Sequence, residues 1–254
     1  MSEAHFFAGH RILTYPKVES TNGLAMQKIK DQQAGHGDIL IAEYQTNGKG
    51  QQTNTWYSSE GANILCSIIC KDIQLPVKNL FSFNMLVSLA VHKVINRYFT
   101  GKTSVKWPND VLVGNQKIAG ILIESVLSGA HVKHMVIGLG INVNESSFPT
   151  ELNSACSFFT LTLSKSNKED ILNELIVTLN EFLTLSGKLS VQEIIKRYEL
   201  VQYGINQKKY FRINNEQIEG IILGVNSEGQ LRVETQTGIL TFNTKQISID
   251  LTGH

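Results

Sequence analysis

The chain has 254 residues, of which 42% are hydrophobic and 18% charged, and its formal net charge is +1. A chain of this composition can bury a core, which excludes a disordered or low-complexity protein. Its near-neutral charge argues against a basic surface for nucleic acid or anionic membranes. Three cysteines are too few for a disulfide framework. With no long apolar run and no visible secretory signal, we expect a cytoplasmic protein that does not associate with membranes.

Strands and helices alternate in the first part of the chain. Ser20 or Thr21 can cap a first helix, which Gly35 ends. Residues 45–59 are polar, contain glycine and show no periodicity, which indicates a loop. The remaining predictions up to residue 113 are strands 11–15, 38–44, 63–71, 104–107 and 111–113, and helices 20–33 and 77–99.

The second part begins with a hairpin turn at Gly114 and Asn115 and changes character after Gly204. Its predicted elements are strands 117–126 and 131–143, helices 168–185 and 191–200, and then short alternating strands. The fold class is therefore α+β: a mixed β-sheet with packed helices over residues 1–203, followed by a small β-barrel over residues 204–254.

The loop after strand 38–44 contains Gly48, Lys49 and Gly50. Two glycines beside a lysine let the backbone approach an anion and supply both N–H groups and an ammonium. The spacing matches neither a Walker A loop nor a dinucleotide fingerprint, because Thr53 stands where a third glycine would be. On its own, such a segment is more often only a loop.

Lys106 ends a short apolar strand, and Pro108 interrupts the pairing that follows. A lysine in this position needs an anion, since a buried unpaired ammonium is costly. The alternative is a lysine that extends to solvent beside a turn, and the residues alone leave both open. Likewise, Gly138 and Gly140 within a strand indicate that a ligand comes close, or that a helix packs tightly there.

Metal and nucleophile signals are weak. Cys66 and Cys70 lie on one face of a strand, but no further ligand completes a zinc site, so we interpret them as core residues. The seven histidines show no metal spacing, and no GxSxG elbow is present. The sequence therefore identifies no certain metal ligand.

Several blocks occur in a characteristic order. They are ESTN at 19–22, AEYQTNGKG at 42–50, Trp56, GAN at 61–63, KWPND at 106–110, KIAGILIE at 117–124 and GLGIN at 138–142. In order and spacing they resemble the catalytic domain of biotin protein ligases, also called biotin–[acetyl-CoA-carboxylase] ligases. The resemblance extends from about residue 10 to about residue 200, and the C-terminal strands look like the family's SH3-like barrel.

The resemblance implies a reaction in two steps. The biotin carboxylate attacks the α-phosphorus of ATP, which gives biotinyl-5′-AMP and pyrophosphate, with Mg²⁺ arriving on ATP. A lysine of the biotin carboxyl carrier protein of acetyl-CoA carboxylase, or of a related carboxylase, then takes the biotinyl group and releases AMP. Because carboxylate and triphosphate repel each other, the site must offer cations and N–H donors to both.

The resemblance also assigns residues. Lys106 would lie between the biotin carboxylate and the α-phosphate, and Lys49 with the backbone of residues 48–51 would surround the acyl-phosphate; these lysines are the catalytic candidates. The implied biotin-binding set is Ser20, Thr21, Asn22, Gln45, Gly48, Lys49, Gly50, Gln51, Lys106, Gly120, Gly138 and Gly140. The implied ATP-binding set is Lys49, Trp56, Asn109, Lys117 and Asn142.

The chain departs from the family pattern at two places. The family loop usually reads close to GRGRRGR, whereas here Gln51 replaces an arginine and Thr53 a glycine, so we expect weaker retention of the intermediate. Only 19 residues precede Ser20, too few for the helix-turn-helix domain of many members. We therefore expect no specific DNA binding, and a monomer or homodimer.

Two other functions stay open. A lipoate or octanoyl attachment enzyme shares the catalytic architecture, but the KWPND block and the C-terminal strands favour biotin. A biotin-binding module that has lost ligation through its altered loop is the non-enzymatic alternative, and the presence of Lys106 argues against it.

Overall fold

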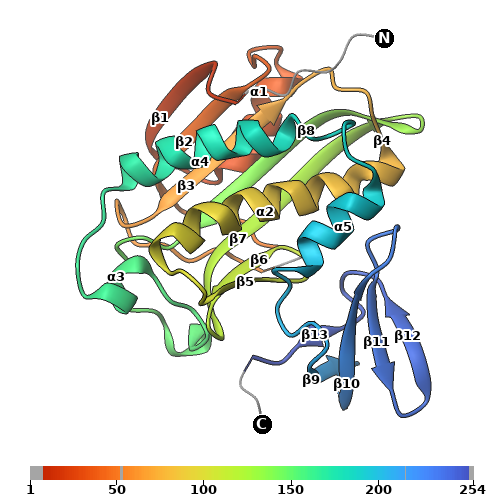
Figure 1. Ribbon diagram of the computed structural model, residues 1–254. Coiled ribbons are helices and arrows are strands. Elements are labelled where there is room, and N and C mark those ends of the chain that lie inside the picture. Colours follow the sequence, from red (N-terminus) through yellow and green to blue (C-terminus); the bar gives the residue numbers. More distant parts are fainter. Residues whose placement is uncertain (1–7, 52–53, 215, 252–254) are drawn as a thin grey trace.

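The computed structural model describes residues 8–51, 54–214 and 216–251 and contains two β-sheets (Figure 1). The larger sheet has eight strands in the order β1-β2-β3-β8-β7-β6-β5, with β4 paired to β8. Only β1 and β2 are parallel among these pairs, so the sheet is mixed. Its strands are β1 (Arg11–Val18), β2 (Asp38–Gln45), β3 (Ile64–Cys70), β4 (Leu75–Pro76), β5 (Thr103–Lys106), β6 (Asp110–Val113), β7 (Gln116–Ser128) and β8 (His131–Ile141).

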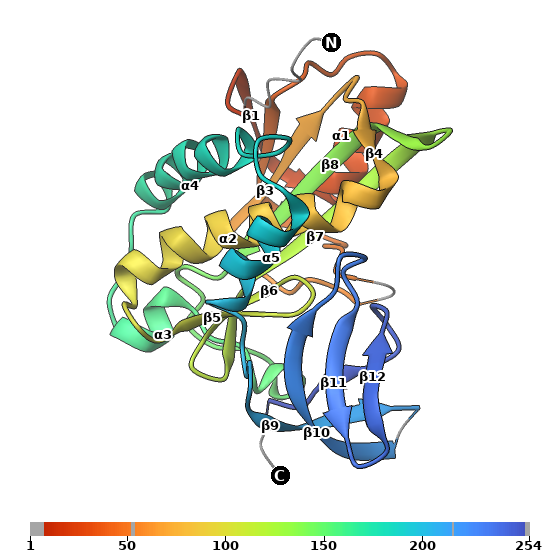
Figure 2. The same cartoon turned by 45° about the vertical axis from the view of Figure 1, so that its right-hand side comes forward.

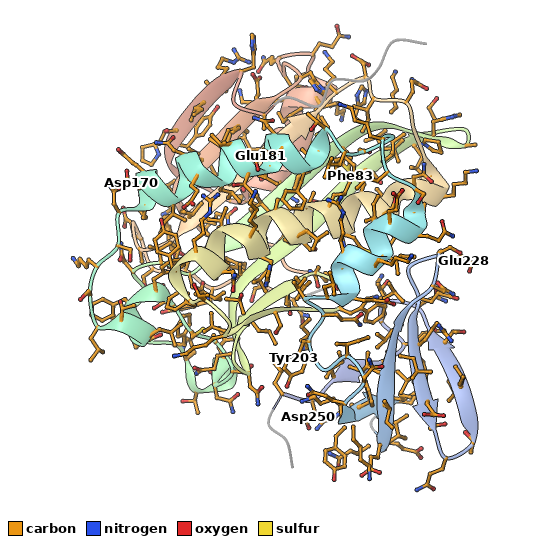
Figure 3. The ribbon with its side chains drawn as sticks, viewed as in Figure 1. Phe83, Asp170, Glu181, Tyr203, Glu228 and Asp250 are labelled. Carbon is orange, nitrogen blue, oxygen red and sulfur yellow. The ribbon has the colours of Figure 1, made fainter. Side chains whose placement is uncertain are left out.

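Helices cover both faces of this sheet. The sheet alternates its side chains, so Ile68 packs under α2 and α4 while Ile69 packs under α1 on the opposite face. Phe83 of α2 is buried against the sheet, and Glu181 of α4 pairs with Lys93 of α2 at 2.8 Å (Figure 3). The helices are α1 (Thr21–Lys30), α2 (Leu80–Tyr98), α3 (Phe158–Thr162), α4 (Lys168–Leu183) and α5 (Val191–Glu199), with 3-10 turns at Val77–Asn79 and Thr150–Leu152.

The chain ends in a second sheet beside α5 (Figure 2). It has five antiparallel strands in the order β12-β11-β10-β9-β13. The strands are β9 (Lys208–Ile213), β10 (Glu216–Val225), β11 (Leu231–Thr235), β12 (Gly238–Phe242) and β13 (Ser248–Ile249). The predicted α+β class is confirmed, and so are the mixed sheet and the small all-β region after residue 204. Among the described residues, no helix is long and apolar enough to span a bilayer.

The structure corrects the prediction in three segments. The helix expected over 77–99 begins as an α-helix only at Leu80, because the chain first pairs with β8 through Leu75 and Pro76. The first helix ends at Lys30, and Gln32 takes a left-handed conformation with φ 58°. Between β8 and α4, the 3-10 turn and α3 were not predicted, because elements of three and five residues are too short to show a period.

One apolar cluster joins the two sheets. Val105 of β5 and Trp107 in the turn that follows it pack with Phe211, Ile222 and Leu231 of the second sheet. The chain crosses between the sheets at Tyr203, whose amide donates to Val105 O at 2.8 Å (Figure 3). The domain boundary predicted at residues 203 and 204 stays a prediction, but the hydrophobic contacts run across it.

A shared core predicts a single unfolding transition. Phe211→Ala removes a fully buried ring and should lower the free energy of unfolding of the whole chain by about 3–5 kcal/mol. The matched change Ile239→Ala, at a side chain that is 55% exposed, should cost less than about 0.5 kcal/mol. Urea denaturation followed by circular dichroism and by tryptophan fluorescence tests this. Two separate transitions would contradict a common core.

Candidate functional site

A cavity opens where the N-terminus of α1 and the loop after β2 meet the middle of β7 and β8. The empty space between these segments, including the part open to solvent, is about 450 Å³. The structure gathers most of the predicted site residues in its wall. These are Ser20, Thr21, Asn22, Gln45, Lys49, Gly50, Gln51, Trp56, Asn109, Lys117, Gly120, Gly138 and Gly140.

Four lining residues were not selected from the sequence: Cys66, Ile121, Leu122 and Leu139. Leu139 pairs in register with Cys66 on one side and Ile121 on the other, and all three side chains pack in the core under α2 and α4. They therefore point away from the face on which Gly138 and Gly140 meet Asn22 and Trp56. Burial raises the pKa of the Cys66 thiol to about 12, so this cysteine is not a nucleophile at neutral pH.

Three predicted residues are not among those that line the cavity. Gly48 lies in the loop, with its carbonyl accepting from Trp56 N at 2.8 Å. Asn142 is buried and donates its amide to Cys156 O, while its Oδ1 has no partner among the described residues. Lys106 lies beside Asp110, its strand partner in β6. Burial lowers the pKa of Lys106, and the charge of Asp110 opposes that shift.

A polar wall forms at the start of α1. Ser20 caps the helix, which leaves the backbone N–H of Thr21 free to donate to Gln45 Oε1 at 2.7 Å. Thr21 and Asn22 are only 4% and 3% exposed, so each polar atom needs a partner. The buried hydroxyl of Ser67, on β3, contacts both of them. The sequence analysis missed Ser67 because nothing in the apolar run of β3 marks one serine as facing α1.

The strand glycines make room for this wall and for Trp56. A Cβ atom on Gly138 would lie 2.3 Å from Asn22 Oδ1, and one on Gly140 would lie 2.4 Å from the indole of Trp56. A Cβ on Gly120 would lie 2.7 Å from the same indole. Such distances exclude any side chain. Of the two interpretations left open for Gly138 and Gly140, close packing of a helix holds at Gly138, where the approaching group is Asn22 of α1. At Gly140 the approaching group is Trp56 of the loop after β2. The approach of a ligand to these glycines stays a prediction.

The loop that carries Lys49 folds back on itself. Lys49 and Thr55 form an antiparallel bridge, and Gly50 N donates to Asn54 O at 2.8 Å. The Gly50 amide, expected to face an anion, is therefore used within the loop. The Lys49 side chain borders the cavity, and no ion pair to it is present in the described ranges. The loop position Thr53, discussed above, lies outside the described residues, as does its neighbour Gln52.

Lys117 is the second cation of the cavity. Its Nζ lies 2.6 Å from Asp110 Oδ1 and 5.3 Å from the centre of the Trp56 ring. These contacts hold the ammonium between the Asp110 carboxylate and the indole of Trp56. Within the described part of the chain, no group of three or more His, Cys, Asp or Glu side chains could hold a metal ion.

Comparison with known proteins identifies the family of this chain. Residues 15–142 match the model of the Biotin/lipoate A/B protein ligase family. The chain belongs to this family of ligase enzymes, as the sequence motifs predicted.

Particular relatives agree with the match. The chain is 29% identical over 244 residues to the bifunctional ligase/repressor BirA of Bacillus spizizenii, covering 93% of this chain and 74% of that protein. It is 31% identical over 144 residues to the biotin–[acetyl-CoA-carboxylase] ligase of Mycobacterium tuberculosis, covering 55% of this chain and 52% of that protein. The fold matches the Aquifex aeolicus biotin protein ligase solved with biotin and ATP, with TM-score 0.79, 22% identity, and 95% and 99% of the two chains covered.

The glycine contacts can be tested directly. Gly140→Ala should push the Trp56 indole away from the strand, which exposes it and costs about 1–3 kcal/mol of stability. Acrylamide quenching in a Trp107→Phe background reports the exposure of this indole. Gly23→Ala is the control, because its nearest atoms would lie at an ordinary 3.8 Å. Equal quenching in the two variants would mean that Gly140 does not seat the indole.

Proposed function

We propose that the protein is an ATP-dependent biotin protein ligase, which forms biotinyl-5′-AMP and transfers the biotinyl group to a lysine of a carrier domain. One observation carries the proposal: a single cavity combines a buried amide-and-hydroxyl wall with two lysines, Lys49 and Lys117. The wall suits a small polar head group such as a ureido ring, and the lysines suit two anions.

The first step brings a carboxylate to a phosphate. The carboxylate oxygen bonds to the α-phosphorus while the bond from that phosphorus to the bridging oxygen breaks, so pyrophosphate leaves. The two reacting groups repel each other because both are negatively charged, and further negative charge develops between them in the transition state. A fixed ammonium stabilises that charge. Lys117 suits this role, because it lines the cavity and is oriented by Asp110. The family resemblance assigned this role to Lys106, which stays a candidate for it.

The nucleotide would extend towards Asn109, Trp56 and Asn142. Two of these residues carry buried polar atoms without partners, Trp56 Nε1 and Asn142 Oδ1. One is a donor and the other an acceptor, as a nucleotide requires. The residues lining the cavity include no carboxylate, so Mg²⁺ would be held mainly by phosphate oxygens.

The second step transfers the acyl group. The amine of the carrier lysine attacks the biotinyl carbonyl carbon, the bond to the AMP oxygen breaks, and AMP leaves. The Mycobacterium tuberculosis relative is named for the acetyl-CoA-carboxylase acceptor. By that similarity, we propose the biotin carboxyl carrier protein of acetyl-CoA carboxylase, or of a related carboxylase, as partner. The absence of specific DNA binding and the state of monomer or homodimer remain predictions.

A lipoate or octanoyl attachment enzyme is the second candidate, since the family includes both kinds. The dithiolane ring of lipoate and the tail of octanoate offer no N–H group to Gln45 and Thr21. The wall therefore favours biotin over these acids.

One experiment separates the alternatives. The chain is incubated with labelled biotin and ATP, with and without a biotin carboxyl carrier domain, and in parallel with lipoate or octanoate. We expect biotinyl-AMP without the carrier and labelled carrier in its presence. Biotin binding with no biotinyl-AMP would indicate a binding module, and transfer of lipoate or octanoate alone would overturn the proposal.

The two lysines can be ranked by paired substitution. Lys117→Met should lower the rate of ATP–pyrophosphate exchange by about 10²–10³-fold, because it removes one preorganised charge contact. Lys106→Met should have the smaller effect, because Lys106 does not line the cavity. The reverse order would assign the charge between the two anions to Lys106, as the sequence predicted.

A further inference from the structure

Glu145, in the segment just after β8, is a buried acidic residue outside the cavity wall. It is only 2% exposed and does not line the cavity. Among the residues that the structure describes, no lysine, arginine or histidine forms an ion pair with it. Burying a carboxylate without a cation is costly, so hydrogen bonds must compensate.

The donors to this carboxylate come from the part of the loop that follows Trp56. Ser59 donates twice, from its backbone N–H to Oε2 at 2.8 Å and from its hydroxyl to Oε1 at 2.7 Å. Asn63 Nδ2 donates to Oε2 at 2.9 Å. A carboxylate can only accept, so both oxygens of Glu145 are occupied by the loop. Ser59 itself is exposed, which means that these bonds rather than burial of its side chain hold it in place.

Asn63 belongs to the GAN block, to which the proposed reaction gives no role. While its Nδ2 donates to Glu145, its Oδ1 accepts from Val143 N at 2.9 Å. The neighbouring Ala62 O accepts from Asn144 N at 2.8 Å. The end of the loop is therefore joined to the segment after β8 by both backbone and side-chain bonds, and Glu145 extends this junction towards Trp56.

Glu145 also contacts the stretch of chain that lies against the start of β7. Its backbone carbonyl accepts from the hydroxyl of Ser157 at 2.7 Å. The preceding residue, Cys156, donates its backbone N–H to Lys117 O at 2.9 Å. Glu145 thus connects two elements of the cavity wall: the loop of Trp56 through its carboxylate, and the strand of Lys117 through its carbonyl and Ser157.

Trp56 and Lys117 meet in the cavity wall, where Lys117 Nζ lies 5.3 Å from the centre of the Trp56 ring. Lys117 is on a strand, whereas Trp56 is on a loop, so the distance between them depends on how the loop is held. The half of the loop before Trp56 bonds to itself, as described above. The half after Trp56 is held through Ser59 by Glu145.

We propose that Glu145 is a positioning residue for the first step of the reaction: its carboxylate anchors the loop so that the Trp56 indole stays against the Lys117 ammonium. The inference rests on the proposed function, because that function places Trp56 and Lys117 beside the nucleotide. Glu145 contacts no substrate. The role belongs to its acceptor oxygens rather than to its negative charge, since all three side-chain contacts are hydrogen bonds from neutral donors.

The test compares variants that keep or remove these acceptors. Glu145→Met retains the length of the side chain and leaves the donors of Ser59 and Asn63 unpaired. Glu145→Gln retains one acceptor oxygen for the two N–H groups, and its NH₂ can donate to the Ser59 hydroxyl, which can also accept. Glu60→Met is the matched control, because Glu60 is the next residue of the same loop and is exposed.

Glu145→Met should lower kcat/KM for ATP in ATP–pyrophosphate exchange by about 10–100-fold, the effect of a small displacement of a positioned group. The KM for biotin should stay near that of the wild type, because the wall at the start of α1 has no contact with Glu145. Glu145→Gln should recover most of the loss, and Glu60→Met should resemble the wild type. A general loss of structure would instead change both KM values and the melting temperature.

A second readout does not depend on activity. In a Trp107→Phe background, Trp56 is the remaining tryptophan, and acrylamide quenching reports its exposure. Glu145→Met should increase this quenching, whereas Glu145→Gln and Glu60→Met should not.

Ser59→Ala removes one of the three contacts from an exposed position, and it keeps the test decisive if Glu145→Met does not fold. It should lower kcat/KM for ATP in the same direction but by less. In a double-mutant cycle, Ser59→Ala should have no further effect once Glu145 is replaced by methionine, because the hydroxyl then has no acceptor.

The proposal is overturned if Glu145→Gln is as impaired as Glu145→Met, if the KM for biotin rises as much as that for ATP, or if Ser59→Ala leaves kcat/KM for ATP unchanged. Unchanged quenching in Glu145→Met would overturn the anchoring of Trp56. Failure of the proposed function is a different result, because the wild type itself would then exchange no pyrophosphate.

Discussion

The site depends on backbone left bare at the centre of the sheet. At Gly138 the amide of Asn22 lies where a Cβ would be, and at Gly140 the indole of Trp56 does. Because these two groups come from the start of α1 and from the loop after β2, bare backbone on β8 is what lets both segments reach the sheet. The glycines therefore let two residues of the cavity wall, Asn22 and Trp56, lie directly against the backbone of the sheet.

Much of the fold and of the cavity wall could be predicted from the sequence, because local sequence patterns determine them. Amphipathic spacing located α2, and a capping serine located the start of α1. The motif blocks named most of the residues that line the cavity. Ser67 was missed, because its position facing α1 depends on strand register, which a single sequence does not show. The family resemblance assigned Lys106 the place between the two anions and Lys117 a place near phosphate, and the role of Lys106 stays a prediction. Both lysines lie at strand ends, and the folded chain adds that Lys117 borders the cavity.

The cations of the site are held in different ways. Lys117 is fixed by Asp110 and the Trp56 ring, whereas Lys49 projects from a loop that uses its own backbone bonds to keep its shape. A fixed charge stabilises a transition state without reorganisation, while a charge on a loop can close over a ligand after it binds. This division suits an enzyme that must first join two anions and then shield a reactive anhydride.

The KWPND turn connects this chemistry to the second sheet. Trp107 is buried in the shared core, and its Nε1 donates to Gly229 O at 3.0 Å, in the turn between β10 and β11. That turn packs so closely that a Cβ on Gly229 would lie 2.1 Å from the Phe81 ring of α2. Two residues further along the KWPND turn, Asn109 lines the cavity, and Asp110 follows as the partner of Lys117. The second sheet thus packs against the turn that carries Asp110, the partner of Lys117. A change in the core between the two sheets is therefore expected to disturb this part of the cavity wall.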